Sequence, residues 1–181
     1  MTIWLASCCL TLENSWTANS LALTVMVRYL ILSSLLLATI VSALIIRSVL
    51  TTSNLNGSNI LDLGMIAVNL KYTTNTGINF GLVGDTAQSR QVLLAAIALI
   101  VCILVIFWSV KSTHPLSILS GGLFAGGGLA NAYERIAFGG VFDYLNVWNQ
   151  FFENHFSFNV ADIYIFIGLV IYVFSGKPNK S

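Results

Sequence analysis

An uninterrupted apolar run between residues 29 and 46 constrains the fold more than any other feature of this sequence. The run follows Arg28 directly and ends at Arg47. Its length suits one helix across a lipid bilayer, which needs about 20 apolar residues. Only 8% of the 181 residues are charged, whereas about a quarter are charged in a typical soluble domain. The sequence therefore predicts an integral membrane protein.

Three further apolar segments, at about 91–108, 116–136 and 160–174, predict three more membrane spans. The segment 116–136 contains five glycines, and small residues at such spacing let membrane helices approach closely. We expect an all-α membrane protein with four transmembrane helices, formed by a single domain over residues 26–181. Residues 1–25 are expected to be an N-terminal tail outside the mature chain, because Met26 lies just before the first long apolar run.

Two segments between the spans, 48–90 and 138–160, are predicted to be external loops. The first has a turn-rich stretch at 51–59 and a partly alternating, β-prone stretch at 66–73, which predict a small β-sheet, or β-cradle, on the membrane surface. The second is rich in aromatic residues and is predicted to be a loop. Basic residues at 28, 111, 177 and 180 cluster on one side of this topology, which places both termini in the cytoplasm and both loops outside.

The charge and the reactive residues exclude several classes of function. A formal net charge of +1 gives no basic field for nucleic acid. The three cysteines form neither a disulfide framework nor a metal-ligand pattern, and His114 and His155 have no partner pattern. No Ser–His arrangement or glycine-rich phosphate loop is present. We therefore expect no metal and no cofactor.

Carboxylates beside apolar segments are the strongest functional signal, because an acid in or near hydrocarbon is costly. Asp143 follows the third predicted span and Asp162 lies in the first turn of the fourth. If the two face each other, they form a pair in which the ionised acid deprotonates a water and the protonated acid donates to the leaving amine. The ordinary alternative, a loop acid and a helix-capping acid, is equally consistent with these two residues alone.

Further polar residues accompany these acids. Asn131, Glu134 and Arg135 end the third span. Arg135 is expected to pair with Glu134 or an external acid, or to reach outward to the interface, and Glu134 is equally consistent with an interfacial anchor. Asn75 and Asn159 lie in turns, where an amide either holds a substrate backbone or caps the turn.

Three motifs, in chain order, resemble those of the bacterial lipoprotein signal peptidases, the signal peptidase II family. The family pattern NxGxxFG is present at residues 75–81, and FNxAD is intact at 158–162. The block GNxxDRxxxGxVxDF corresponds to residues 130–144, with Gly139 matching the family glycine. The resemblance covers residues 28 to 176.

This resemblance implies an aspartyl endopeptidase of the bacterial cytoplasmic (inner) membrane, with its active site near the outer face. It implies cleavage of diacylglyceryl-modified prolipoproteins just before the lipidated cysteine, in contact with membrane lipids, with no metal and with globomycin as inhibitor. The positions that match the catalytic pair are Asp143 and Asp162. The positions that match site-lining or substrate-binding residues are Asn75, Gly77, Asn131, Glu134, Arg135, Asn159 and Ala161.

The sequence also departs from the family pattern. Glu134 stands where the family has aspartate, Ala130 replaces a glycine, and the stretch from Ala43 to Arg47 keeps the cation of an Asp-x-x-x-Lys element but lacks its acid. These departures predict a divergent peptidase, or alternatively a non-catalytic relative that binds lipoproteins. A transporter or channel subunit is disfavoured, because all three acids lie near one predicted surface rather than at midplane depth.

Overall fold

The computed structural model describes residues 2–64, 66–77, 87–112, 114, 116–149 and 154–174. This part of the chain is mostly helical, with one small antiparallel sheet. Its helices are α1 (Thr2–Thr52), α2 (Ala87–Lys111), α3 (Leu116–Phe138) and α4 (Val160–Phe174). Its strands are β1 (Asn59–Asp62), β2 (Ile66–Asn75), β3 (Val141–Asn149) and β4 (Asn154–Phe158).

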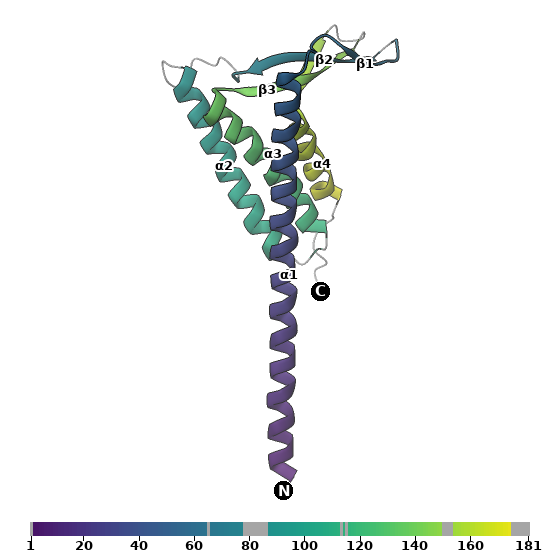
Figure 1. The fold of residues 1–181 in the computed structure, drawn as a ribbon. Helices are drawn as coiled ribbons and strands as arrows, with labels where there is room; N and C mark the ends of the chain where they lie inside the picture. Colours follow the sequence, from purple (N-terminus) through teal and green to yellow (C-terminus); the bar gives the residue numbers. More distant parts are fainter. Residues whose placement is uncertain are drawn as a thin grey trace.

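Helix α3 lies at the centre of the bundle, where α1, α2 and α4 pack against it (Figure 1). Its glycines permit this, because each faces a neighbouring helix too closely for a side chain. A Cβ added at Gly122 would lie 2.7 Å from the Leu35 Cβ of α1, and one at Gly128 would lie 2.6 Å from a thiol of α2. A Cβ at Gly127 would overlap the Ala161 carbonyl oxygen of α4. The glycines of α3 therefore allow the close approach of neighbouring helices that the sequence predicts.

Two helical segments, Ala22–Thr52 and Gln88–Lys111, are long and apolar enough to cross a membrane, and α4 is a shorter apolar helix. Side chains such as Ile97 and Ile100 of α2 are exposed on the outside of the bundle. Two of the four predicted spans thus have the length and composition of membrane helices. The spans predicted for α3 and α4 stay predictions.

Helix α1 differs from the prediction at its N-terminal end. The helical backbone is continuous from Thr2, and its first part projects beyond the bundle (Figure 1). Arg28 marks the level where α1 meets the other helices, since its Nη2 donates to the carbonyl oxygens of Ser109, at 3.0 Å, and of Ser112. The backbone before residue 26 is therefore helical, while its absence from the mature chain stays a prediction.

The sheet lies across the end of the bundle where α1 and α3 end and α4 begins (Figure 1). Its strand order is β1-β2-β3-β4, and all neighbours are antiparallel. The prediction of strands in the segment 48–90 is confirmed by β1 and β2. The prediction that 138–160 is only a loop was wrong, because its β-branched and aromatic residues form β3 and β4. Pairing of Thr73 with Asp143 and of Asn75 with Val141 brings the segments 48–90 and 138–160 together.

Candidate active site

Asn159 and Asp162 form a reciprocal cap at the N-terminus of α4. The Asn159 backbone N–H donates to Asp162 Oδ2 at 2.9 Å, and the Asp162 N–H donates to Asn159 Oδ1 at 3.1 Å. This is the geometry of a capping box, in which two helix-end donors are satisfied by each other's side chains. The cap holds Asp162 at the end of α4 that faces the sheet.

Asp143 lies on β3 and is only 3% exposed. Asn75, on the paired strand β2, donates from Nδ2 to Asp143 Oδ2 at 2.9 Å. The Asn159 Nδ2 approaches Asp143 Oδ1 at 3.4 Å. Burial raises the pKa of Asp143 from 3.8 to about 6, although the hydrogen bond from Asn75 acts in the opposite direction. Asp143 therefore keeps a proton over a wider pH range than an exposed aspartate.

Two asparagines join the carboxylates into one network. Asn159 Nδ2 also donates to Asn131 Oδ1 at 3.1 Å, and Asn131 Nδ2 donates to Asp162 Oδ1 at 2.7 Å. Asn159 thus contacts Asp143 with its side chain and Asp162 with its backbone. Ala161, which directly precedes Asp162, is buried against α3. The structure therefore gathers these predicted site residues around the junction of β3, α3 and α4.

Glu134 connects α1, α3 and β3. Its Oε2 accepts a 2.7 Å hydrogen bond from the Phe142 backbone N–H, and its Oε1 lies 3.4 Å from Arg47 Nε. The Arg47 guanidinium also stacks 3.6 Å from the centre of the Phe138 ring. Because Phe142 directly precedes Asp143, Glu134 fixes the strand segment that carries the candidate catalytic acid. The cation retained at the end of α1 is thus the ion-pair partner of Glu134.

The ion pair between Arg135 and Glu134, one of the alternatives that the sequence left open, does not form in the structure, where Glu134 pairs with Arg47. Adjacent helix residues point in different directions, and Arg135 Nη1 donates instead to Gln91 Oε1 of α2 at 3.0 Å. Gln91 Nε2 in turn donates to the Thr76 carbonyl oxygen at 2.5 Å. Gln91 is 2% exposed, and sequence reasoning missed it although it is the polar residue that precedes the apolar run of α2.

Gly77 lies in the turn after β2, where its φ of +82° is in the left-handed region. A Cβ at this position would lie 2.7 Å from Leu94 Cδ1 and 3.9 Å from Arg135 Nη1. The turn is also closed by the Gly77 N–H, which donates to Asn75 Oδ1 at 2.9 Å. A glycine is required here because the chain turns next to the side chains of α2 and α3. Residues 78–81 of the same motif lie outside the described residues.

The polar residues do not form a metal site in the described part of the chain. No three His, Cys, Asp or Glu side chains gather there in a ligand-like group. His114 lies in the turn between α2 and α3, where its Nδ1 accepts the Leu116 N–H at 3.2 Å. The side chain of His155 lies outside the described residues. The expectation that no metal is required stays a prediction.

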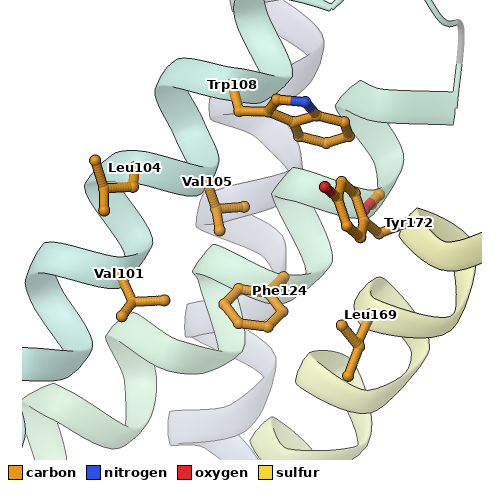
Figure 2. A pocket seen from close by; sticks show the side chains of 8 residues that line it. Val101, Leu104, Val105, Trp108, Phe124, Leu169 and Tyr172 are labelled. Atoms are coloured by element: carbon orange, nitrogen blue, oxygen red, sulfur yellow. The ribbon is translucent and has the colours of Figure 1, made fainter. Parts of the chain in front are cut away.

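An apolar pocket of about 300 Å³ lies between α2, α3 and α4, closer to the other end of the bundle. Figure 2 shows Phe124 of α3 between the side chains of α2 and those of α4. The rings of Trp108 and Tyr172 meet edge-to-face at one end of the pocket, with their centres 4.5 Å apart. Val101 and Leu169 lie toward its other end. The pocket therefore has an aromatic wall at one end and aliphatic sides.

Comparison with solved structures shows the fold. A structure titled "Bacterial membrane enzyme structure by the in meso method at 1.9 A resolution" superposes with a TM-score of 0.65 and 18% identity, over 80% of this chain and 90% of the other. A second with the same title at 2.3 Å gives a TM-score of 0.63 over 83% and 93% of the two chains, also at 18% identity. The bundle and its sheet are thus the fold of a bacterial membrane enzyme.

Comparison of sequences shows the family. A lipoprotein signal peptidase of Rhodopseudomonas palustris (strain TIE-1) is 31% identical over 100 residues, which cover 53% of this chain and 60% of that protein. One of Rickettsia bellii is 35% identical over 117 residues, which cover 62% and 58%. The chain thus matches about 60% of the length of these curated relatives. The sequence model of the family described as signal peptidase (SPase) II matches residues 30–176, and the chain belongs to this family.

Proposed function

We propose that the protein is a membrane aspartyl endopeptidase that removes the signal peptide from diacylglyceryl-modified prolipoproteins, with cleavage just before the lipidated cysteine. Membership of the signal peptidase II family supports the reaction. One observation carries the assignment of residues: Asn159 bonds both Asp143 and Asp162, so that the two carboxylates share one hydrogen-bond network.

The two carboxylates have different roles in the proposed reaction, one as proton donor and the other as proton acceptor. Asp143, buried and with a pKa of about 6, supplies the proton that polarises the scissile carbonyl and then reaches the leaving amine. Asp162, whose two oxygens each accept an N–H hydrogen bond, takes the proton from the attacking water. Each acid is held by asparagine donors, so that neither has to reorganise when charge develops in the transition state. No metal or cofactor enters this scheme.

The proposed orientation places the catalytic pair Asp143 and Asp162, the dyad, at the outer membrane surface. It places both termini in the cytoplasm, with all four helices crossing the bilayer. The sheet and both acids lie at one end of the bundle, whereas α1 begins and α4 ends toward the other (Figure 1). Arg28 and Lys111 lie at that second end, where Arg28 bonds the last turn of α2. Basic residues concentrate on the cytoplasmic side of membrane proteins, which supports this orientation.

The proposed substrate approaches along the membrane surface, with its lipid in the bilayer and its peptide beneath the sheet. Asn75 and the turn at Gly77 stand beside Asp143, and the proposed peptide lies against this end of β2. Gln91 of α2 donates to the carbonyl of that turn, and Arg135 of α3 donates to Gln91. The expected inhibitor globomycin belongs to the same proposal and competes for this site.

The test is cleavage of a purified diacylglyceryl-modified prolipoprotein by the full-length protein in detergent, with and without globomycin. We expect globomycin-sensitive cleavage before the modified cysteine, identified by mass spectrometry, and none of the unlipidated precursor. Asp162→Asn should lower the rate by at least about a hundredfold, the usual contribution of a general base. The matched control is Asp62→Asn, which removes an exposed acid of β1 and should leave the rate unchanged.

The same assay separates the peptidase from a non-catalytic relative. A folded wild-type protein that binds the lipidated precursor without cleaving it would refute the peptidase and favour a lipoprotein-binding function. Globomycin-insensitive cleavage that Asp162→Asn retains would refute the assignment of the dyad.

A further inference from the structure

The apolar pocket and the candidate active site lie on the same faces of three helices. On an α-helix, residues seven positions apart are two turns apart on one face. Asn131 and Phe124 are related in this way on α3, as are Asp162 and Leu169 on α4. On α2, Leu94 beside Gly77 shares its face with Val101 and Trp108, each seven residues further on. On each of the three helices, one face therefore runs from the candidate site to the pocket.

The pocket lies at a depth that fits a lipid chain. At a rise of 1.5 Å per residue, Leu169 lies roughly 10 Å and Tyr172 roughly 15 Å along α4 from Asp162. The side chains that line the pocket include Val101, Leu104, Val105, Phe124 and Leu169. A chain that enters from the site would meet the paired rings of Trp108 and Tyr172 last (Figure 2).

We infer that this pocket holds the distal part of one acyl chain of the diacylglyceryl substrate, and that the Trp108–Tyr172 pair limits the chain length that fits. The inference rests on the proposed function, because it takes the lipid of that substrate as its occupant. Continuity with the candidate site favours this occupant over a lipid of the surrounding bilayer. The second acyl chain remains in the membrane.

The effect on catalysis arises from packing rather than from removal of the chain from water. An acyl chain outside the pocket already lies in hydrocarbon, so that transfer into an apolar pocket yields little hydrophobic free energy. A chain that is too short leaves a void against the aromatic pair, and one that is too long must bend or displace a ring. An unfilled space of methyl size changes kcat/KM by about fivefold. The wild-type protein should therefore show an optimum chain length.

The first experiment measures kcat/KM for prolipoproteins with a graded series of saturated acyl chains, using full-length protein in detergent. Leu169→Trp fills the pocket and should move the optimum to shorter chains. Tyr172→Ala opens its end and should move the optimum to longer ones. The matched control is Ile167→Trp, on the same helix and as exposed as Leu169 but outside the pocket lining, which should keep the wild-type optimum. An identical profile in all four proteins would overturn the inference while leaving the peptidase intact.

A second experiment does not depend on cleavage. The protein used is Asp143→Asn, which should bind substrate without cleaving it. A substrate with bromine at the end of its acyl chains should quench the fluorescence of Trp108. This contribution is obtained by subtracting the fluorescence of the Asp143→Asn protein that also carries Trp108→Phe. Equal quenching by a brominated phospholipid without the peptide would identify a bilayer lipid as the occupant and overturn the inference. Absence of quenching by the bound substrate would also overturn the inference. Failure of wild-type protein to cleave any chain length would instead refute the proposed function.

Discussion

Replacing Asp143 by asparagine should change how the stability of the protein depends on pH. Asp143 is buried beneath the sheet, and burial raises its pKa to about 6, from 3.8 in an unfolded chain. The folded state therefore binds the Asp143 proton more tightly than the unfolded state does. As the pH rises from about 4 to about 6, unfolding releases this proton, and the free energy of unfolding falls. The loss is complete at about pH 7, where Asp143 is ionised in both states.

The size of this effect follows from the difference between the two pKa values. One pKa unit corresponds to 1.36 kcal/mol, so that the wild-type protein should lose about 3 kcal/mol relative to Asp143→Asn between about pH 4 and about pH 7. For a domain of this length, each kcal/mol shifts Tm by about 2–4 °C. The difference in Tm between wild type and variant should therefore change by roughly 6–12 °C over this range.

The assay is thermal unfolding in a non-ionic detergent at a series of pH values, followed by near-ultraviolet circular dichroism. Comparison with Asp143→Asn removes the contributions of all other titrating groups, because these are common to both proteins. Asp62→Asn, which removes an exposed acid, should follow the wild-type curve. A wild-type-minus-variant difference that stays constant, or that favours the wild type as the pH rises, would refute the account of Asp143 as a buried, proton-retaining acid.

Three other substitutions test the framework around the site. Glu134→Ala leaves the buried N–H of Phe142 without its acceptor, and we expect a loss of about 1–3 kcal/mol in detergent–SDS unfolding together with a lower kcat. Gly127→Ala places a methyl group against the Ala161 carbonyl oxygen, and the forced separation of α3 and α4 should cost about 1–3 kcal/mol in the same titration. Gly77→Ala strains a residue with φ of +82° by about 1–2 kcal/mol. Because this turn lies at the proposed substrate-binding side of the site, KM should rise more than kcat falls. Unchanged kinetics would show that this turn does not contact substrate.

Much of the helical framework could be predicted from the sequence, because long apolar runs and their basic ends are local signals. The strands β3 and β4 could not, although Val141–Asn149 is rich in β-branched and aromatic residues. Because the segment lies between two predicted spans, it was interpreted as an aromatic-rich loop. The pairing of this strand with β2 joins residues about 70 positions apart, and a single sequence carries no local signal for such a contact.

The candidate site shows the same division. The cap made by Asn159 and Asp162 is readable from their three-residue spacing at the start of an apolar helix. The partners of Glu134 and Arg135 were not readable, because both neighbours lie on other helices: Arg47 on α1 and Gln91 on α2. A pair between Glu134 and Arg135 was only one of the alternatives that the sequence left open. Adjacent helix residues point in different directions, and the two side chains bond Arg47 and Gln91 instead.

The central claim, that Asp143 and Asp162 act as one catalytic unit, is tested most directly by single-turnover cleavage of a diacylglyceryl-modified prolipoprotein. The proteins to compare are the wild type, Asp143→Asn, Asp162→Asn and the double variant, each shown to be folded and to bind the precursor. Residues that act as a unit are strongly non-additive, so that each single variant should lose at least about a hundredfold in rate and the double variant little more. Near-wild-type cleavage by either single variant, or losses that multiply in the double variant, would contradict the account.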